Sequence, residues 1–280
     1  MNPISLAQII DSVQDLPSLP AIVMELLNHV DNDNLDMQEL THKVSLDLAL
    51  TAKTLRYANS PYYGAMIKVT TVQQAISLLG LNTVKQIVIT AALSGCFPEN
   101  NCKGFSHKDF WRHSNAVAIA AKILAKRLNL NTDVAFTAGL LHDIGALVLA
   151  TSYTSAYEAV LLQRLEQPST QFEVEKQLLE IDHAAIGEAL AVQWNFSDTM
   201  IKAIAGHHQP DKPGLGFLAT IIHVADGIAH ALGVTTTPDL APPEVSGQSW
   251  ESLGLDEESF SQILAEAAAA FKKLQQDIEV

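Results

Sequence analysis

The sequence has little of several features that would define other classes of protein. Its only cysteines are Cys96 and Cys102, which are too few for a disulfide framework and are not spaced as a CxxC metal or redox motif. Basic residues are outnumbered by acidic ones, and the formal net charge of -14 disfavours a protein that mainly grips a nucleic-acid backbone. Charged residues make up 17% of the chain and hydrophobic residues 48%, so we expect a globular chain with a large core.

Long uninterrupted hydrophobic runs are also scarce. Charged residues or histidines break the apolar stretches before they reach the roughly 20 residues that a membrane helix requires. The start of the chain, MNPISLAQIIDSV, lacks a basic segment followed by an apolar stretch and a small-residue cleavage site. We therefore expect a cytoplasmic protein without a membrane partner.

The hydrophobic pattern predicts an all-α fold, because apolar residues recur at helical spacing and no segment shows the alternation typical of strands. The polar segment PENNCKG, residues 98 to 104, is the expected boundary between two helical lobes. We predict an N-terminal lobe over residues 1–97 and a second lobe over 98–235. A loop and a C-terminal helix are expected over residues 236–280.

The stretch AFTAGLLHDIGALVLA, residues 135 to 150, is the most informative part of the chain. The pattern predicts one apolar helix with a kink near Gly145. The only strongly polar side chains in this helix are the adjacent His142 and Asp143. Burying an isolated charge costs several kcal/mol or more, so these side chains need a partner. The partner is either a hydrogen-bonding or ionic group on a neighbouring helix or a metal ion.

Further histidines and one more carboxylate fall on inward-facing positions of the second lobe. His113 shares a helical face with apolar residues in 108–128, and His183 does so in 182–194. Asp226 is the only acid in the apolar helix predicted over residues 217–232. The complete inward-facing polar set is His113, His142, Asp143, His183, His207, His208 and Asp226.

This combination of residue types is typical of a metal centre. A single buried histidine is usually a satisfied core residue, but so many imidazoles with two carboxylates are hard to explain by structure alone. Imidazole and carboxylate suit a divalent transition metal such as Fe, Mn, Ni, Co or Zn, and a bridging carboxylate can hold a pair of ions about 3.5 to 4 Å apart. Such a centre can activate water for attack on phosphorus and stabilise the charge on phosphoryl oxygens.

These motifs resemble a known family. HDIG at 142–145, preceded by WRHS and followed in order by DH, HH and AD, resembles the HD superfamily of metal-dependent phosphohydrolases. In the first lobe, LPSLP at 16–20, SLDLALTAKTLRYANSPYYG at 45–64 and AISLLG at 75–80 resemble the HDOD group. The resemblance covers roughly residues 12–235, which together would form one HDOD module.

The resemblance implies an all-α module of bacterial signal transduction, related to the HD-GYP cyclic di-GMP phosphodiesterases. It implies metal ligation by His142, Asp143, His183, His207, His208 and Asp226, with His113 as a seventh ligand or beside them. Asp143 and His113 are the catalytic candidates.

Two departures from the HD-GYP pattern concern the substrate. Ala146 stands where those enzymes have a lysine that can contact phosphate, and HHQPDKPG at 207–214 contains no GYP element. These departures weaken the cyclic di-GMP assignment more than the metal assignment, because the ligand types survive while the substrate contacts do not. Other basic candidates for contact with a phosphate are Arg112, Lys202 and Lys212.

Three functions fit the sequence. The first is a metal-dependent phosphohydrolase that acts on a nucleotide or another phosphate ester. The second is a non-catalytic signalling module that keeps the site as structure or as a ligand sensor and meets a partner protein through its N-terminal lobe. The third is a DNA-binding regulator that uses the helix-turn-helix spacing of residues 72–93, although VKQIVITAALSG offers only Lys85 as a base and favours core packing.

Overall fold

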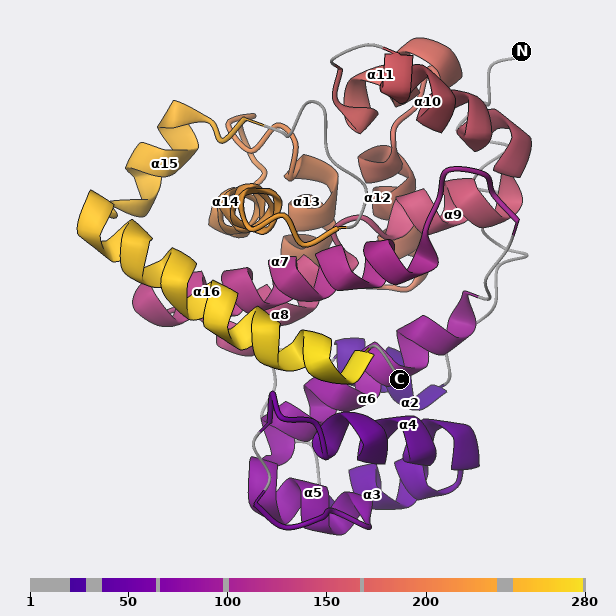
Figure 1. Cartoon of the computed structure of the whole chain (residues 1–280), viewed down its shortest axis with the longest axis vertical. Coiled ribbons are helices and arrows are strands. Elements are labelled where there is room, and N and C mark those ends of the chain that lie inside the picture. The colour runs from indigo at the N-terminus through magenta and orange to yellow at the C-terminus, as the bar shows by residue number, and fades with distance from the viewer. Residues whose placement is uncertain are drawn as a thin grey trace. The chain divides into compact units, whose positions relative to one another are not determined.

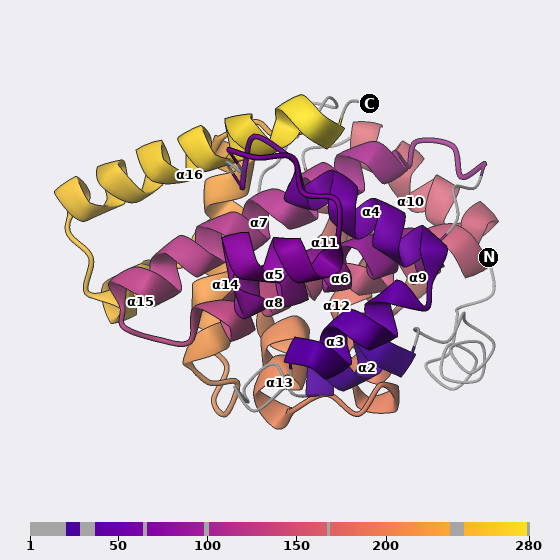
Figure 2. The same ribbon diagram turned by 90° about the horizontal axis from the view of Figure 1, so that it is seen from below.

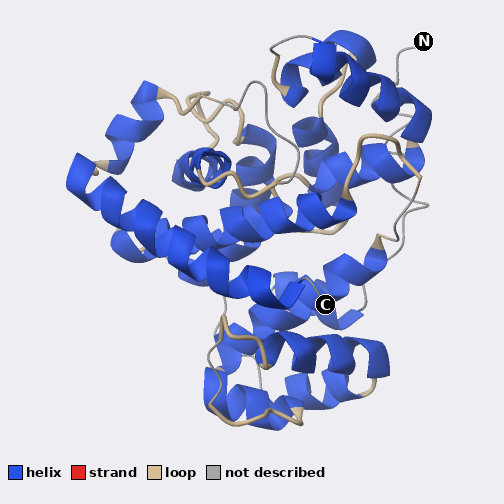
Figure 3. Ribbon diagram, in the orientation of Figure 1, coloured by secondary structure: helices blue, strands red, loops and turns tan. Residues whose placement is uncertain are grey.

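The computed structural model describes residues 21–28, 37–63, 66–97, 101–166, 169–235 and 244–278. The described residues form helices joined by turns and loops and contain no strand (Figure 3). This confirms the predicted all-α fold. The LPSLP motif at 16–20 lies outside the described residues.

The chain divides into two compact units, and each is described by itself. One unit contains the described residues between 101 and 264, and the other contains those between 21 and 97 together with 265–278. The last helix, α16 (Glu257–Ile278), therefore has residues in both units.

The unit that includes residues 21–97 has a core centred on its longest complete helix. Its helices are α2 (Ala21–Asn28), α3 (Met37–Ser45), α4 (Leu48–Ala58), α5 (Val72–Leu79) and α6 (Leu81–Cys96). Helix α6 packs against α2, α4 and α5, and its Val84, Ile87 and Val88 are fully buried. Lys85 is only 7% exposed. The second helix of the helix-turn-helix spacing thus packs in the core, which is unsuited to reading a DNA groove.

The other unit begins with the long helix α7 (His107–Arg127), which packs against α8 and α14. Figures 1 and 2 both show α7 beside α8. Helix α12 packs against α9 and α13, and α10 packs against α11. The helices after α7 are α8 (Thr132–Leu141), α9 (Ile144–Ser152), α10 (Thr154–Glu166), α11 (Gln171–Leu179), α12 (His183–Gln193), α13 (Asp198–Gly206), α14 (Phe217–Ala231) and α15 (Gly247–Leu253).

The apolar stretch around His142 and Asp143 forms two helices, so the prediction of one helix kinked near Gly145 was wrong. Helix α8 ends at Leu141 and α9 begins at Ile144, with the two polar residues between them. The His142 ring donates from Nδ1 to the carbonyl oxygen of Gly139 at 2.8 Å. In a continuous helix that carbonyl would accept from the backbone N–H of Asp143, so the side chain competes with the helical ladder at this point.

Taken as one segment, Thr132–Ser152 is long and apolar enough to cross a membrane by length and composition. However, 89% of its most apolar window is buried inside the protein, as in a core helix. The interruption at His142 and Asp143 lies within this segment.

Candidate metal centre

Two glycines allow the helices around His142 and Asp143 to approach closely. A Cβ atom on Gly139 of α8 would lie 2.8 Å from the Cα of Ala118 on α7. A Cβ atom on Gly145 of α9 would collide with the carbonyl oxygen of His183 at the start of α12. Both obstacles are backbone atoms that cannot rotate away. The glycines therefore let α7 and α12 bring His113 and His183 up to the polar break.

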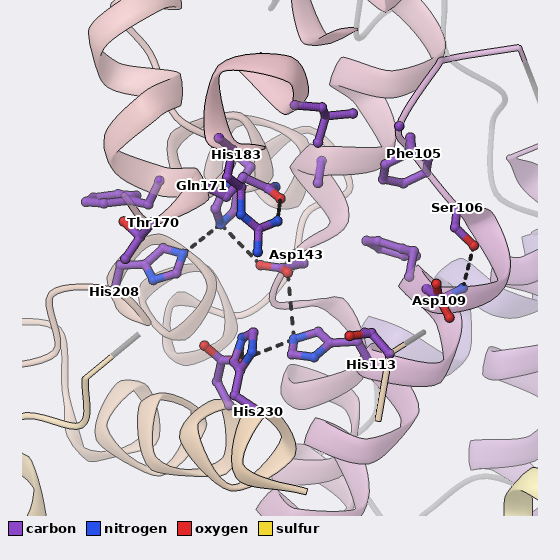
Figure 4. A pocket seen from close by; sticks show the side chains of 18 residues that line it. Phe105, Ser106, Asp109, His113, Asp143, Thr170, Gln171, His183, His208 and His230 are labelled. Carbon is purple, nitrogen blue, oxygen red and sulfur yellow. Dashed lines mark hydrogen bonds and ion pairs between the residues drawn. The ribbon is translucent and has the colours of Figure 1, made fainter. Parts of the chain in front are cut away.

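The structure brings together all seven residues of the inward-facing polar set. His113 lies on α7, His142 and Asp143 lie between α8 and α9, and Asp226 lies on α14. His183 opens α12, while His207 and His208 directly follow α13. All are buried except Asp143 and His208, which are partly exposed. Figure 4 shows His113, His183 and His208 around Asp143.

The Asp143 carboxylate sits between several imidazoles. Its Oδ1 lies 3.2 Å from His183 Nε2, 3.3 Å from His207 Nε2 and 3.4 Å from His142 Nε2. Its Oδ2 lies 3.9 Å from His113 Nε2. The two oxygens thus face different histidines, as a bridging carboxylate does.

Asp226 forms a second centre of contacts. Its Oδ1 lies 3.0 Å from His113 Nε2 and 3.3 Å from His230 Nε2. Sequence reasoning missed His230, although its position four residues after Asp226 places both on one face of α14. That spacing could have identified it once Asp226 was suspected.

Three of the imidazole rings are fixed by hydrogen bonds at their Nδ1 atoms. His142 Nδ1 donates to Gly139 O at 2.8 Å, His207 Nδ1 donates to Ile204 O at 2.7 Å, and His183 Nδ1 bonds to Glu175 Oε2 at 2.6 Å. With Nδ1 carrying a hydrogen, the Nε2 atom of each ring points toward the Asp143 carboxylate. Metal-ligating histidines usually have such an outer hydrogen bond, which fixes the ring and its tautomer.

Sequence reasoning also missed Glu175, which is fully buried on α11. It accepts hydrogen bonds from both the ring and the backbone N–H of His183. The chain reverses between α11 and α12, where Glu180 adopts the left-handed conformation with φ 60°. No spacing in the sequence reveals a pairing that depends on this turn.

Some polar atoms at the centre have no hydrogen-bond partner, although His208 Nε2 lies 2.8 Å from His183 Nε2 and His113 Nε2 lies 3.3 Å from His142 Nε2. Asp143 Oδ1, His207 Nε2 and Asp226 Oδ1 are buried and have no hydrogen-bond partner within the described part of the chain. Buried polar atoms nearly always have a hydrogen-bond partner, so a group of such atoms without one requires an explanation. Asp143 Oδ1 and Asp226 Oδ1 lie within ion-pair distance of imidazole nitrogens, so opposite charge is close to them although no hydrogen bond reaches them. Converging acceptor oxygens and nitrogen lone pairs are the donor set of a transition metal.

The ligand atoms fall into two principal groups. The Asp143 group consists of Asp143, His183, His207 and His208, and the Asp226 group consists of Asp226, His113 and His230. Within each group the candidate ligand atoms lie within 4.8 Å of one another. His142 lies beside both aspartates and forms a third combination with His113 and Asp143.

The electrostatics follow from burial and from close opposite charges. Burial opposes ionisation of both aspartates, but the surrounding histidines hold the pKa of each carboxyl well below its usual range. Burial lowers the pKa of His142 to about 4 and holds that of His208 well below its usual value. His183 differs, because Glu175 and Asp143 outweigh its burial and raise its pKa. Neutral imidazoles and ionised carboxylates are the forms that bind metals.

A cavity of about 170 Å³ opens onto this cluster. His113, Asp143, His183, His208, Asp226 and His230 all line it. Ala146 also lines it, at the position where HD-GYP enzymes have a lysine.

The three basic candidates from the sequence, Arg112, Lys202 and Lys212, are not among the described residues that line this cavity. Arg164, on the last turn of α10, lines it instead. Position near a motif in the sequence was a poor guide here, because α10 folds back over the site from a separate part of the unit.

The all-α fold and the buried cluster of histidines and aspartates define a protein of the HD superfamily. The chain belongs to the HDOD domain family, which matches residues 16–210. It is 25% identical over 214 residues to an uncharacterized protein of Treponema pallidum (strain Nichols), covering 74% of this chain and 40% of that protein. It is 31% identical over 124 residues to ribonuclease Y of Geobacter sulfurreducens, covering 44% of this chain and 18% of that enzyme. The chain thus spans less than half the length of these relatives.

Solved structures show the same fold. An HDOD domain protein of unknown function from Geobacter sulfurreducens has a TM-score of 0.82 at 23% identity, and the match covers 98% of both chains. A presumed phosphohydrolase from Shewanella amazonensis SB2B has a TM-score of 0.78 at 28% identity, covering 96% of this chain and 97% of that chain. A presumed signal transduction protein from Marinobacter aquaeolei VT8 has a TM-score of 0.82 at 24% identity, covering 100% of this chain and 63% of that one.

Proposed function

We propose that this protein is a metal-dependent phosphohydrolase of HD type that acts on a nucleotide or another phosphate ester in bacterial signal transduction. The proposal depends mainly on three buried atoms that have no hydrogen-bond partner within the described residues, namely Asp143 Oδ1, His207 Nε2 and Asp226 Oδ1. A metal ion would supply the direct bonds that these atoms lack, because within the described residues they have ion-pair contacts with neighbouring side chains but no hydrogen bond.

The residues fit a pair of divalent transition metals. The Asp143 group would hold one ion, the Asp226 group would hold the other, and His142 would complete the set between them. When bound, such metals act as Lewis acids on phosphoryl oxygens and make water a nucleophile near neutral pH.

In this proposal, residues of the chain would orient the ester and transfer protons. Asp143 and His113 both line the cavity, so they lie where an ester would meet the centre. His113 lines the cavity beside Asp226, with its Nε2 3.0 Å from Asp226 Oδ1, and it would transfer a proton there in the state in which that nitrogen is not bound to metal. These contacts support the choice of Asp143 and His113 as the catalytic residues.

The similar proteins support the reaction class more than the substrate. Ribonuclease Y is by name a nuclease, and the Shewanella amazonensis protein is named as a presumed phosphohydrolase. Both names concern hydrolysis at phosphorus. The net charge of -14 and the small cavity disfavour RNA or another nucleic acid as the substrate of this chain.

The second candidate is a non-catalytic signalling module in a cytoplasmic pathway, with a protein partner at the N-terminal lobe. Ala146 favours it, because a methyl group faces the cavity where HD-GYP enzymes have a lysine. In this alternative the metal centre would be a structural or ligand-sensing element.

Metal content and activity together test the proposal. The protein is purified without chelator and measured by elemental mass spectrometry, and release of phosphate or nucleotide is then followed for a panel of esters with added Mn or Fe. We expect bound transition metal and metal-dependent turnover that is lost in Asp143→Ala. Bound metal with no turnover on the panel would favour the signalling module, and no bound metal after loading would refute the metal centre itself.

A further inference from the structure

Helices α10 and α11 form one wall of the cavity, and none of the residues that line this wall belongs to the candidate ligand groups. Arg164 is near the end of α10, and Thr170, Gln171 and Phe172 stand at the beginning of α11. All four residues line the cavity together with Leu161. Because α10 and α11 pack against each other, this wall is one structural element.

Arg164 is connected to a metal-ligand histidine through hydrogen bonds. Its Nη1 donates to Gln171 Oε1 at 3.3 Å, and Gln171 Nε2 donates to Glu175 Oε1 at 3.1 Å and to the Tyr157 hydroxyl at 2.6 Å. Glu175 Oε2 in turn accepts from the ring and backbone of His183. One hydrogen-bond network therefore connects the Arg164 guanidinium group with His183 of the Asp143 group.

The described side chains around the cavity carry more negative than positive charge, apart from any bound metal. Asp109, Asp143 and Asp226 contribute carboxylates, and Arg164 is the only lysine or arginine among the described residues that line it. A guanidinium group carries parallel N–H donors that match two phosphate oxygens, which makes arginine well suited to this task. Arg164 can thus supply the contact that Ala146 cannot.

The size of the cavity restricts the ester. Its volume of about 170 Å³ is below the roughly 300–1,000 Å³ of pockets that enclose drug-sized ligands. The enclosed part of the cavity favours a phosphate group with few attached atoms over a phosphate substituted on both sides. Phe105, Phe110 and Phe172 give the remaining wall an apolar surface for the organic part.

We propose that Arg164 binds the phosphate group of a small phosphomonoester beside the metal centre. This inference rests on the proposed function, because it assumes that the metal centre acts on the same phosphate. It adds a substrate-binding residue and selects monoesters over diesters.

Binding of inorganic phosphate to the metal-loaded full chain tests the role of Arg164. Isothermal titration is performed on the wild type, on Arg164→Gln and on the control Arg127→Gln, which removes an exposed arginine paired with Gln262. Loss of a charged hydrogen-bonding contact predicts phosphate affinity about tenfold or more weaker in Arg164→Gln and nearly unchanged in Arg127→Gln. Elemental analysis before each titration is expected to show equal metal content in all three proteins.

The outcomes separate the two proposals. Equal phosphate affinity in Arg164→Gln and wild type, with metal retained, contradicts the role of Arg164 and leaves the metal centre standing. No metal in the loaded wild type refutes the proposed function and this inference together. If Arg164→Gln does not fold, the same phosphate titration is performed on Arg164→Lys, because lysine keeps the positive charge but lacks the paired N–H donors. Its affinity should fall severalfold, and an unchanged value contradicts the inference.

Hydrolysis rates of a monoester and a diester test the proposed preference for monoesters. Hydrolysis of p-nitrophenyl phosphate should exceed hydrolysis of bis(p-nitrophenyl) phosphate, and Arg164→Gln should raise KM for the monoester more than it lowers kcat. Faster hydrolysis of the diester by the wild type would overturn the selection of monoesters.

Discussion

The two halves of the candidate metal centre are built differently. The Asp143 group draws its histidines from α12 and from the end of α13, and the ring of His183 is tied to Glu175 on α11. The Asp226 group needs only α7 and α14, which pack directly together, and two of its members stand four residues apart on one helix. The first half thus depends on several tertiary contacts, whereas the second depends on one helix pair.

This difference has a consequence for metal affinity. A ligand whose ring is fixed in advance loses less conformational freedom when metal binds, so outer hydrogen bonds strengthen a site. His183 and His207 have such bonds to Glu175 and to the carbonyl of Ile204. We therefore expect the Asp143 group to hold its ion more tightly than the Asp226 group.

The largest effect is expected from Asp143→Ala, because Asp143 faces histidines of both groups. Both ions and all metal-dependent turnover should be lost, while the fold is retained. Elemental analysis and circular dichroism measure the two properties. If the aspartate merely pairs with histidine, metal content stays the same and the free energy of unfolding falls by about 3 to 5 kcal/mol.

His230→Gln separates the two halves, because it removes one candidate ligand of the Asp226 group, and His230 is not a member of the Asp143 group. We expect metal content to fall from two ions to one. The same substitution at exposed His42, in the other unit, should leave metal content unchanged. Loss of both ions from His230→Gln would show that the halves do not bind independently.

Glu175→Gln tests the outer contact of the Asp143 group. Substitution of such a residue typically costs about 10- to 100-fold in metal affinity, and we expect a loss of this size for the tighter ion. Competition with a chelator measures it. Glu173→Gln on the same helix is the matched control, because Glu173 is exposed and caps the helix, a task that glutamine also performs. Equal affinities in the two variants would contradict the role of Glu175.

A smaller effect is expected from pH. Burial disfavours the charged ring, but Glu175 and Asp143 raise the pKa of His183 well above its usual value, so the metal-free protein keeps a proton that metal must displace. Metal affinity should therefore rise with pH below that pKa, by about tenfold per unit for one proton displaced. Chelator competition between about pH 6 and pH 8 measures the slope. The slope should be shallower in Glu175→Gln, and an equal slope would contradict this explanation.

The ligand set could be predicted from sequence because lone histidines and aspartates stand out in apolar helices. His113, His183 and Asp226 each share a helical face with core residues, which by itself predicts that they point inward. Gly145 could be seen in the sequence, but its role could not. It permits contact with the backbone of α12, and only the structure shows which helix lies against α9.

The contacts that the sequence did not reveal depend on packing between helices. Glu175 reaches His183 through a left-handed turn at Glu180, and Arg164 reaches the cavity because α10 folds over it. The helix break at His142 was also missed, because it depends on a side chain taking the carbonyl of Gly139. Periodicity reports which face of a helix is buried, but not which element covers that face.

Anomalous diffraction from crystals of protein loaded with Mn or Fe tests the metal centre most directly. We expect two peaks at the absorption edge, one within about 2.0 to 2.3 Å of Asp143 oxygen and imidazole nitrogen and one at the same distance from Asp226. The stronger occupancy should be at the Asp143 group. A map without peaks, in which Asp143 Oδ1 and Asp226 Oδ1 instead accept ordinary hydrogen bonds, would contradict the central claim.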